Sequence, residues 1–198
     1  MREVIDYYLT AASPWTYLGH PRLTDIAAKT GAEIRCKPAH FGEIFSQTGG
    51  LPLPKRAPAR QAYRMMELKR WKARLGLPIN VKPPFHPVDD GAANRMIVAA
   101  GQAGLDPLAV AWALLRACWE QDRNLADPDD LIAAAGEAGF DGAALLAAAE
   151  GEAAQAEFRR NIDEALAAGV FGAPTYGIDG ELFWGQDRLD FVAEKLSA

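Results

Sequence analysis

The stretch that decides the fold lies near the end of the chain and reads VFGAPTYGIDGELFWGQDRL over residues 170–189. Asp179-Gly180 separates two short runs of aromatic and β-branched residues, which is the strongest short-range signal for a β-hairpin. Pro174 stands at the start of the first run, where its missing N–H takes nothing from the ladder of hydrogen bonds. After the second run, Asp187 is expected to cap a final helix. The stretch therefore predicts a strand, a turn, a second strand and a helix.

The start of the chain predicts a strand, a helix and another strand. Residues 4–9 form a short apolar and aromatic run that suits a buried strand. Ser13 followed by Pro14 is typical of a helix start, because the hydroxyl can accept from an early backbone N–H and proline there loses no useful donor. Gly31 is expected to end that helix, and residues 32–38 alternate apolar and polar side chains. We expect this parallel crossover to be right-handed.

These two units resemble the two halves of a thioredoxin fold, in which a cis-proline before a strand faces the active site. Pro174 stands at that position and is therefore expected to be cis. We assign residues 1–40 and 169–198 to a thioredoxin-like domain and residues 41–168 to a large inserted all-α domain, which gives an α/β fold class. Helical patterns in the insertion cover 61–75, 92–103, 108–119, 141–149 and 152–168, a further helix starts at 127–128, and 76–90 is a proline-rich loop.

The composition narrows the class of partner. Of the 198 residues, 49% are hydrophobic and 24% are charged, so the chain has enough apolar side chains for a sizeable core. The formal net charge of −5 argues against nucleic acid as the main partner. No apolar run approaches the roughly 18 residues that a membrane span needs, so no membrane partner is expected. The first residues read as a strand without a cleavage site, which predicts a cytoplasmic protein.

The two cysteines, Cys36 and Cys118, stand far apart and in no metal-ligand spacing. The sequence has no Cys-x-x-Cys motif, so we expect neither a disulfide-cycling pair nor a metal site. Two reduced structural thiols are the expected state. A disulfide between them, or a single catalytic cysteine, is the alternative.

Basic residues gather over 55–74, where Glu67 is the single counter-charge. They are Lys55, Arg56, Arg60, Arg64, Lys69, Arg70, Lys72 and Arg74. A solvated helix face explains such a cluster. Local attraction of an anionic ligand also explains it, despite the negative total charge. The sequence leaves both interpretations open.

Ser13 is expected at the N-terminus of the first helix, where free N–H groups and the helix dipole stabilise an anion. Redox proteins of this fold carry the cysteine of Cys-x-x-Cys there, so a chain with serine cannot cycle a disulfide at this place. Serine needs an adjacent base to act as a nucleophile. His20 lies about 10 Å along the helix, too far for a hydrogen bond. No spacing ties His40 or His86 to Ser13, and His86 is expected to be packed.

Two roles for Ser13 remain on the residues alone. Its hydroxyl can serve only as a helix cap. Alternatively, it can donate a hydrogen bond to an external thiolate, such as that of glutathione, and keep the thiol ionised together with the helix dipole. In the second case the protein borrows its nucleophile from a bound thiol.

Several motifs together resemble one family. They are Ser13-Pro14, the helical insertion with its stretches 119–122 and 125–128, Gly172-Ala173-Pro174-Thr175, and FWGQDRL over 183–189. With these motifs the chain resembles the 2-hydroxychromene-2-carboxylate isomerases, which belong with the kappa-class glutathione transferases in the DsbA-like branch of the thioredoxin superfamily. The resemblance spans essentially the whole chain, and the tryptophan-glycine-glutamine-aspartate stretch is its most specific part.

The resemblance implies a function and a set of site residues. Ser13 would activate the sulfur of glutathione, Ala173 before Pro174 would pair its backbone with the cysteinyl unit, and Gln186 and Asp187 would hold the γ-glutamyl end. The implied reaction interconverts 2-hydroxychromene-2-carboxylate and trans-o-hydroxybenzylidenepyruvate in aromatic catabolism. Addition of the thiolate to the unsaturated ketone would permit rotation, and elimination would release the isomer. The family also implies a homodimer that takes glutathione and a small aromatic carboxylate.

One position departs from the family pattern. Kappa-class relatives carry an asparagine that contacts glutathione in the loop after the second strand, and Leu51 occupies that place here. The alternatives are therefore a kappa-like transferase acting on another electrophile, and a non-catalytic thioredoxin-fold binding protein. A substrate pocket between the domains would involve aromatic side chains that also suit a core, namely Phe41, Phe45, Tyr63 and Phe85.

Overall fold

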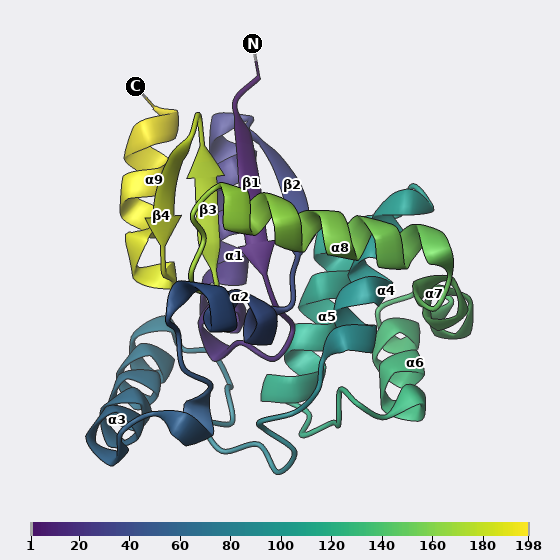
Figure 1. The fold of residues 1–198 in the computed structure, drawn as a ribbon, viewed down its shortest axis with the longest axis horizontal. Helices are drawn as coiled ribbons and strands as arrows, with labels where there is room; N and C mark the ends of the chain where they lie inside the picture. Colours follow the sequence, from purple (N-terminus) through teal and green to yellow (C-terminus); the bar gives the residue numbers. More distant parts are fainter. Residues whose placement is uncertain (1, 198) are drawn as a thin grey trace.

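A four-stranded sheet lies to one side of the structure, a computed structural model that describes residues 2–197 (Figure 1). Its strands are β1 (Val4–Leu9), β2 (Glu33–Pro38), β3 (Thr175–Ile178) and β4 (Glu181–Trp184), in the order β2-β1-β3-β4. β1 pairs in parallel with β2, while β3 pairs antiparallel with both β1 and β4. The two ends of the chain thus share one sheet, as the sequence predicts.

Helices occupy most of the remaining chain, and all but one of the α-helices, the one over residues 41–48, were predicted from the sequence. They are α1 (Pro14–Thr30), α2 (Phe41–Thr48), α3 (Pro58–Leu75), α4 (Gly91–Gln102), α5 (Pro107–Trp119), α6 (Pro128–Glu137), α7 (Gly142–Ala149), α8 (Glu152–Ala167) and α9 (Leu189–Leu196), with short 3-10 helices η1 (Leu53–Lys55) and η2 (Gln186–Arg188). The expected fold class, a thioredoxin-like unit with a large all-α insertion, is confirmed. The domain bounds stay a prediction, because one hydrophobic core runs through the sheet and the insertion.

The two faces of β1 bury side chains in two different clusters, as strand alternation requires. Ile5 and Tyr7 point into the main core with α1 and α5, and the ring of Tyr7 stacks on that of Tyr176 at 5.6 Å between centroids. Tyr8 points the other way and packs against α2 and α8. Figure 1 shows α8 crossing the near face of the sheet and α1 behind it. Both faces of the sheet are therefore covered by helices.

The C-terminal hairpin forms as predicted, but the helix after it begins differently. Asp179 and Gly180 have φ values of 50° and 81°, which is the left-handed pair that a tight hairpin turn needs. The prediction that Asp187 caps the last helix is wrong. Gly185, at φ 104°, turns the chain into η2 first, so Asp187 lies inside η2 and makes no capping contact to α9. The Asp187 carboxylate is therefore not used to cap α9.

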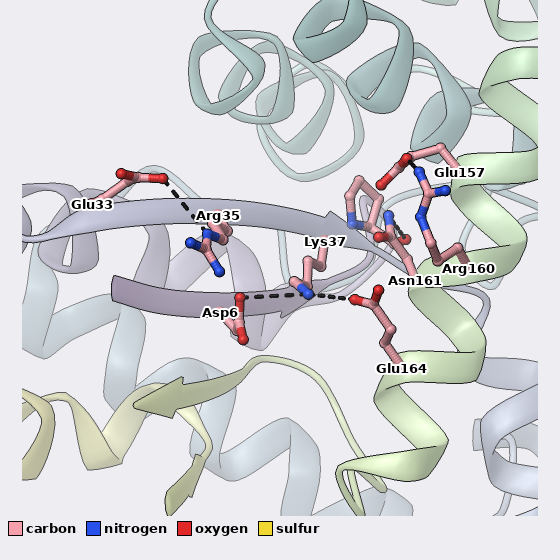
Figure 2. Close-up of polar contacts among 9 residues, drawn as sticks. Asp6, Glu33, Arg35, Lys37, Glu157, Arg160, Asn161 and Glu164 are labelled. Carbon is pink, nitrogen blue, oxygen red and sulfur yellow. Dashed lines mark hydrogen bonds and ion pairs between the residues drawn. The ribbon is translucent and has the colours of Figure 1, made fainter. Parts of the chain in front are cut away.

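A half-buried lysine joins the sheet to α8, the helix that leads back to β3. Figure 2 shows Lys37 of β2 between Asp6 of β1 and Glu164 of α8. The Lys37 Nζ lies 3.5 Å from Asp6 Oδ1 and also pairs with Glu164. Asn161 of α8 donates to the Pro38 carbonyl at 3.2 Å. These contacts hold α8 against β1 and β2.

Candidate functional site

Ser13 lies directly before α1 and acts as its N-cap. The Ser13 Oγ accepts a hydrogen bond from the Thr16 N–H at 3.2 Å, and Pro14 holds the first helical position. Ser13 is 8% exposed. Among the described residues its hydroxyl accepts but donates to no partner, so its proton remains available to a ligand. The capping role and the proposed activating role are therefore compatible.

The loop that precedes Ser13 is held by α4 of the insertion. Asp90 Oδ2 accepts from the Thr10 hydroxyl and, at 2.8 Å, from the Ala12 N–H. Asn94 Oδ1 accepts from the Ala11 N–H at 3.0 Å, and its amide donates to Thr10 Oγ1 at 3.2 Å. Burial raises the pKa of Asp90, and the hydrogen bond from Thr10 opposes that rise. Sequence reasoning missed both residues, because no local pattern links α4 to this loop.

The Ala173-Pro174 peptide bond is cis, as the sequence predicts. The N–H and C=O of Ala173 take part in no hydrogen bond within residues 2–197. Its neighbours are tied down, since the Pro174 carbonyl accepts from the Gly185 N–H at 2.9 Å and the Thr175 hydroxyl donates to Gly172 O at 2.6 Å. Ala173 therefore presents a free backbone pair on a fixed segment.

Gln186 and Asp187 lie side by side in η2 but in different surroundings. Gln186 is 2% exposed, and its side-chain and backbone oxygens both accept from Arg22 of α1, at 3.2 Å and 3.0 Å. A Cβ at Gly19 would lie 2.8 Å from the Gln186 Cβ, so this close approach of α1 requires glycine. Asp187 is exposed and lies 3.4 Å from the guanidinium of Arg188. Gln186 is anchored, whereas Asp187 faces outward.

Two adjoining hollows contain the expected site residues. The Ser13 hollow, about 360 Å³, is lined by Ser13, His40, Phe45, Arg64, His86 and Ala173 among others. The Gln186 hollow, about 400 Å³, is lined by Trp15, Tyr63, Trp71, Ala173, Gln186 and Asp187 among others. Trp15, Arg56 and Ala173 border both hollows. The structure thus brings Ser13 and Ala173 together on one hollow. Gln186 and Asp187 line the second hollow, which shares Trp15, Arg56 and Ala173 with the first.

The histidines divide between the core and the site. His20 is buried, its ring stacks on Trp112 and its Nδ1 lies 3.3 Å from the Tyr7 hydroxyl, so it stays away from Ser13 as expected. His40 and His86 line the Ser13 hollow, a placement that no sequence spacing indicated. His40 Nδ1 accepts from the Glu43 N–H at 3.2 Å, which caps α2. Neither hydrogen-bonds to Ser13 among the described contacts, so no serine–histidine pair forms.

His86 is packed as expected, against Trp119, with ring centroids 4.8 Å apart. The pKa of His86 is lowered to about 4, mainly by burial and also by the positive charge of Arg64, while a hydrogen bond to the Ala12 backbone opposes both effects. His86 is therefore neutral at physiological pH. It offers the Ser13 hollow a polar but uncharged edge.

Both cysteines are free, and neither lines the Ser13 hollow or the Gln186 hollow. Burial raises the pKa of the Cys118 thiol to about 12, and it raises that of Cys36 as well. Neither thiol is thus ionised near neutral pH. Within residues 2–197 no three His, Cys, Asp or Glu side chains gather closely enough to hold a metal ion. No helix in the same range has the length and apolar character to cross a membrane.

The fold and the site define a thioredoxin-fold protein whose first helix starts with serine at the position where redox members carry cysteine. A family model described as a DSBA-like thioredoxin domain matches residues 4–197. The chain is 31% identical to a 2-hydroxychromene-2-carboxylate isomerase of Sphingobium xenophagum over 197 residues, which cover 99% of each chain. It is 25% identical to glutathione S-transferase kappa 1 of Rattus norvegicus, over 96% of this chain and 89% of that one.

Solved structures show the same fold. A 2-hydroxychromene-2-carboxylate isomerase superposes with a TM-score of 0.83 at 22% identity, over 98% of this chain and 94% of that one. The cytosolic disulfide reductase DsbM of Pseudomonas aeruginosa, solved with GSH, gives 0.69 at 19% identity over 98% and 100%. The chain belongs to the DsbA-like thioredoxin family and, within it, to the 2-hydroxychromene-2-carboxylate isomerase family. Relatives named as isomerases and glutathione transferases support an enzyme.

Proposed function

We propose that this protein is a glutathione-dependent isomerase that interconverts 2-hydroxychromene-2-carboxylate and trans-o-hydroxybenzylidenepyruvate in aromatic catabolism. One observation carries the proposal. The Ser13 hydroxyl and the free backbone of Ala173 border a single hollow, in a chain 31% identical over its full length to an isomerase of that name.

The residues present fit glutathione. The Ser13 hydroxyl still has a proton to donate, and it lies where the α1 dipole favours an anion. The unpaired N–H and C=O of Ala173 suit the main chain of a short peptide, which would add as a strand does. The exposed carboxylate of Asp187 suits an ammonium group at the far end. Pro174 fixes the segment between these groups.

The chemistry divides between the ligand and the chain. Bound glutathione would supply a thiolate whose reversible addition to the unsaturated ketone form lets a former double bond rotate. Ser13 donates a hydrogen bond that keeps the thiol ionised near neutral pH, which is the protein's main electronic contribution. Phe41 and Phe45 give the Ser13 hollow apolar walls that exclude water from the reacting atoms.

Leu51 bears on the strength of glutathione binding. Its side chain is 50% exposed and cannot form a hydrogen bond, while its carbonyl accepts from Arg56 Nε at 2.7 Å. It borders a third hollow, the Leu51 hollow, about 660 Å³, together with Tyr63 and Trp184. We therefore expect glutathione to bind more weakly than it would with an amide side chain at this place.

The test uses the purified protein with reduced glutathione and 2-hydroxychromene-2-carboxylate. The absorbance of the open unsaturated ketone follows isomerisation, and mass spectrometry identifies any stable conjugate. Glutathione-dependent isomerisation without a conjugate supports the proposal. A stable conjugate with another electrophile would favour the kappa-like transferase to which the chain is also similar. Absence of glutathione binding in calorimetry at millimolar concentration would favour a non-catalytic binding protein, the alternative that Leu51 suggests.

We further propose a cytoplasmic homodimer. The two free thiols suit a reducing compartment, where glutathione itself is kept in the thiol form. The dimer is carried over from the family resemblance. Light scattering coupled to size-exclusion chromatography tests it, since a monomeric mass at micromolar concentration would exclude a stable dimer.

A further inference from the structure

Two arginines of the basic cluster stand on the Ser13 hollow without a carboxylate partner. Arg64 of α3 is partly buried, and its one polar contact among the described residues is the sulfur of Met65 at 4.0 Å. Arg56 donates to the Leu51 carbonyl and lies over the ring of Phe45 at 5.9 Å. Neither guanidinium forms an ion pair within residues 2–197. Burying a cation without a counter-ion costs free energy, so we expect an anionic group of a ligand to bind beside these two guanidinium groups.

The rest of the basic cluster behaves differently. Arg70 pairs with Glu67 on the outer face of α3, and Lys72 donates to the Ile79 carbonyl at 2.7 Å. Arg74 lies over the ring of Trp71 at 5.6 Å. These side chains are accounted for by neighbours or solvent. Lys55, Arg60 and Lys69 also form no ion pair among the described residues, but they are exposed to solvent. Arg56 and Arg64 are therefore the members of the cluster that are partly buried and lack a carboxylate partner.

The carboxylates that also line the Ser13 hollow are already occupied. Asp90 accepts from Thr10 and Ala12, and Asp89 Oδ1 accepts from the Gly91 N–H at 2.9 Å. Burial and the neighbouring charge of Arg56 lower the pKa of Arg64 to about 10, which still leaves it protonated near neutral pH. Asp89 and Asp90 keep these hydrogen bonds to their own neighbours, and neither forms an ion pair with Arg56 or Arg64 among the described residues.

Arg64 lies on the side of the site away from the Gln186 hollow. It lines the Ser13 hollow and the Leu51 hollow, but it does not line the Gln186 hollow, where the far end of glutathione is expected. Its charge reaches His86, whose neutral ring lines the Ser13 hollow beside it. Phe41 and Phe45 supply apolar walls in the same space. This combination of a cation, a neutral polar edge and flat apolar walls suits a planar aromatic acid.

We propose that Arg64, supported by Arg56, binds the carboxylate of the second substrate in the Ser13 hollow and selects planar aromatic 2-oxo acids over uncharged analogues. The inference rests on the proposed function for the identity of that substrate. A guanidinium can hold a carboxylate through two parallel hydrogen bonds, which fixes orientation as well as charge. The glycyl carboxylate of glutathione has the same chemistry, and Arg56, which borders all three hollows, is the residue placed to meet it.

The experiment measures binding without turnover. The probe is benzylidenepyruvate, which lacks the phenolic hydroxyl needed for ring closure, and its methyl ester serves as the uncharged comparison. Calorimetry is carried out with and without S-methylglutathione, which occupies the glutathione site but has no free thiol. The variants are Arg64→Gln and Arg64→Lys. Arg70→Gln is the matched control, because it removes one charge from the same helix at an exposed, ion-paired position.

We expect wild type to bind the acid about tenfold or more tightly than the ester. Arg64→Gln should remove most of that preference, Arg64→Lys should retain part of it, and Arg70→Gln should change it by less than about twofold. Affinity for S-methylglutathione should stay unchanged in both Arg64 variants. Circular dichroism melting checks that each variant folds, and the acid-to-ester ratio of wild type remains decisive if one does not.

Equal binding of acid and ester by wild type would overturn the proposal. So would an Arg64→Gln protein that loses affinity for S-methylglutathione but not for the acid, since the anion would then be that of the peptide. Failure of the proposed function gives a different result. A protein that prefers the acid to the ester through Arg64, yet isomerises nothing, would retain this carboxylate site and refute the isomerase.

Discussion

The carboxylate of Asp90, at the start of α4, accepts a hydrogen bond from the Ala12 N–H at 2.8 Å, one residue before Ser13. The helical insertion therefore directly holds the loop that precedes Ser13. Asp90→Ala would leave the Thr10 hydroxyl and the Ala12 N–H without an acceptor. We expect it to lower the free energy of unfolding by about 2 kcal/mol and to reduce kcat more than KM. Urea unfolding and steady-state kinetics measure the two effects, and unchanged kcat in a folded variant would contradict the positioning role.

Asp90→Asn isolates the charge of the same side chain, because its amide oxygen can still accept from Thr10 and Ala12. Burial raises the pKa of Asp90 above its ordinary value of 3.8, so the folded state keeps this proton to higher pH than the unfolded state does. The stabilising contribution of Asp90 is thus full below pH 3.8 and is lost as pH rises through the folded value. Unfolding free energies of wild type minus Asp90→Asn should fall with pH across that window. A flat difference would contradict the raised pKa.

Ser13→Ala should slow isomerisation by about tenfold or more and raise the pKa of glutathione bound to the protein. It also removes the cap of α1, which costs about 1 kcal/mol of stability. Ser13→Asp separates the two roles, since its ionised carboxylate can cap the helix but cannot donate to a thiolate. Ultraviolet titration of the bound thiolate gives the pKa, and thermal melting gives the stability. A fully active Ser13→Asp protein would reduce Ser13 to a helix cap.

Gly19→Ala should destabilise the fold by forcing α1 away from Gln186 and Tyr176. The added Cβ would meet the Gln186 Cβ and the Tyr176 hydroxyl at 2.8 Å, so α1 and η2 would have to move apart. We expect a loss of about 1–3 kcal/mol in stability. Gly136→Ala is the control, because nothing lies within 4 Å of the corresponding Cβ in α6 and alanine favours a helix there. Equal stability of both variants would argue against the tight contact of α1 with η2.

Lys37→Met should destabilise the fold by leaving Asp6 and Glu164 without their shared cation. We expect about 1–2 kcal/mol, less than for fully buried pairs, because both carboxylates are partly exposed. Arg35→Gln, which removes an exposed contact to Glu33 on the same strand, should change stability by less than about 0.5 kcal/mol. Chemical denaturation at low salt compares the two. If both variants lose the same stability, Lys37 contributes no more than a surface ion pair.

The strands, α1 and the hairpin turn could be predicted because their signals are local. Residues 4–9, Ser13-Pro14 and Asp179-Gly180 each specify conformation within a few positions. The helix α2 was not among the expected helices, because it is short and its cap is His40, a residue with weak capping preference. The prediction that Asp187 caps the last helix was wrong because Gly185, with its positive φ, turns the chain into η2 first.

The roles of the site residues stay predictions, and the family resemblance named only some of the residues that gather there. Ser13 and Ala173, which it named, lie on one hollow. The same hollow is also lined by His86 of the proline-rich loop 76–90, Asp90 at the start of α4 and Arg64 of α3. The packing of these three elements depends on contacts between residues far apart in the sequence. No periodicity reports such contacts. The unpaired state of Arg64 could be recognised only once the partners of its neighbours were known.

Gly172 restricts how this family member can change over time. A Cβ at residue 172 would lie 2.3 Å from the indole Nε1 of Trp184, so any other amino acid must displace that ring. Trp184 in turn borders both the Gln186 hollow and the Leu51 hollow. Replacement of Trp184 by a smaller residue, as a change of ligand preference would require, would therefore also make room for a side chain at residue 172. The two positions are expected to evolve as a pair.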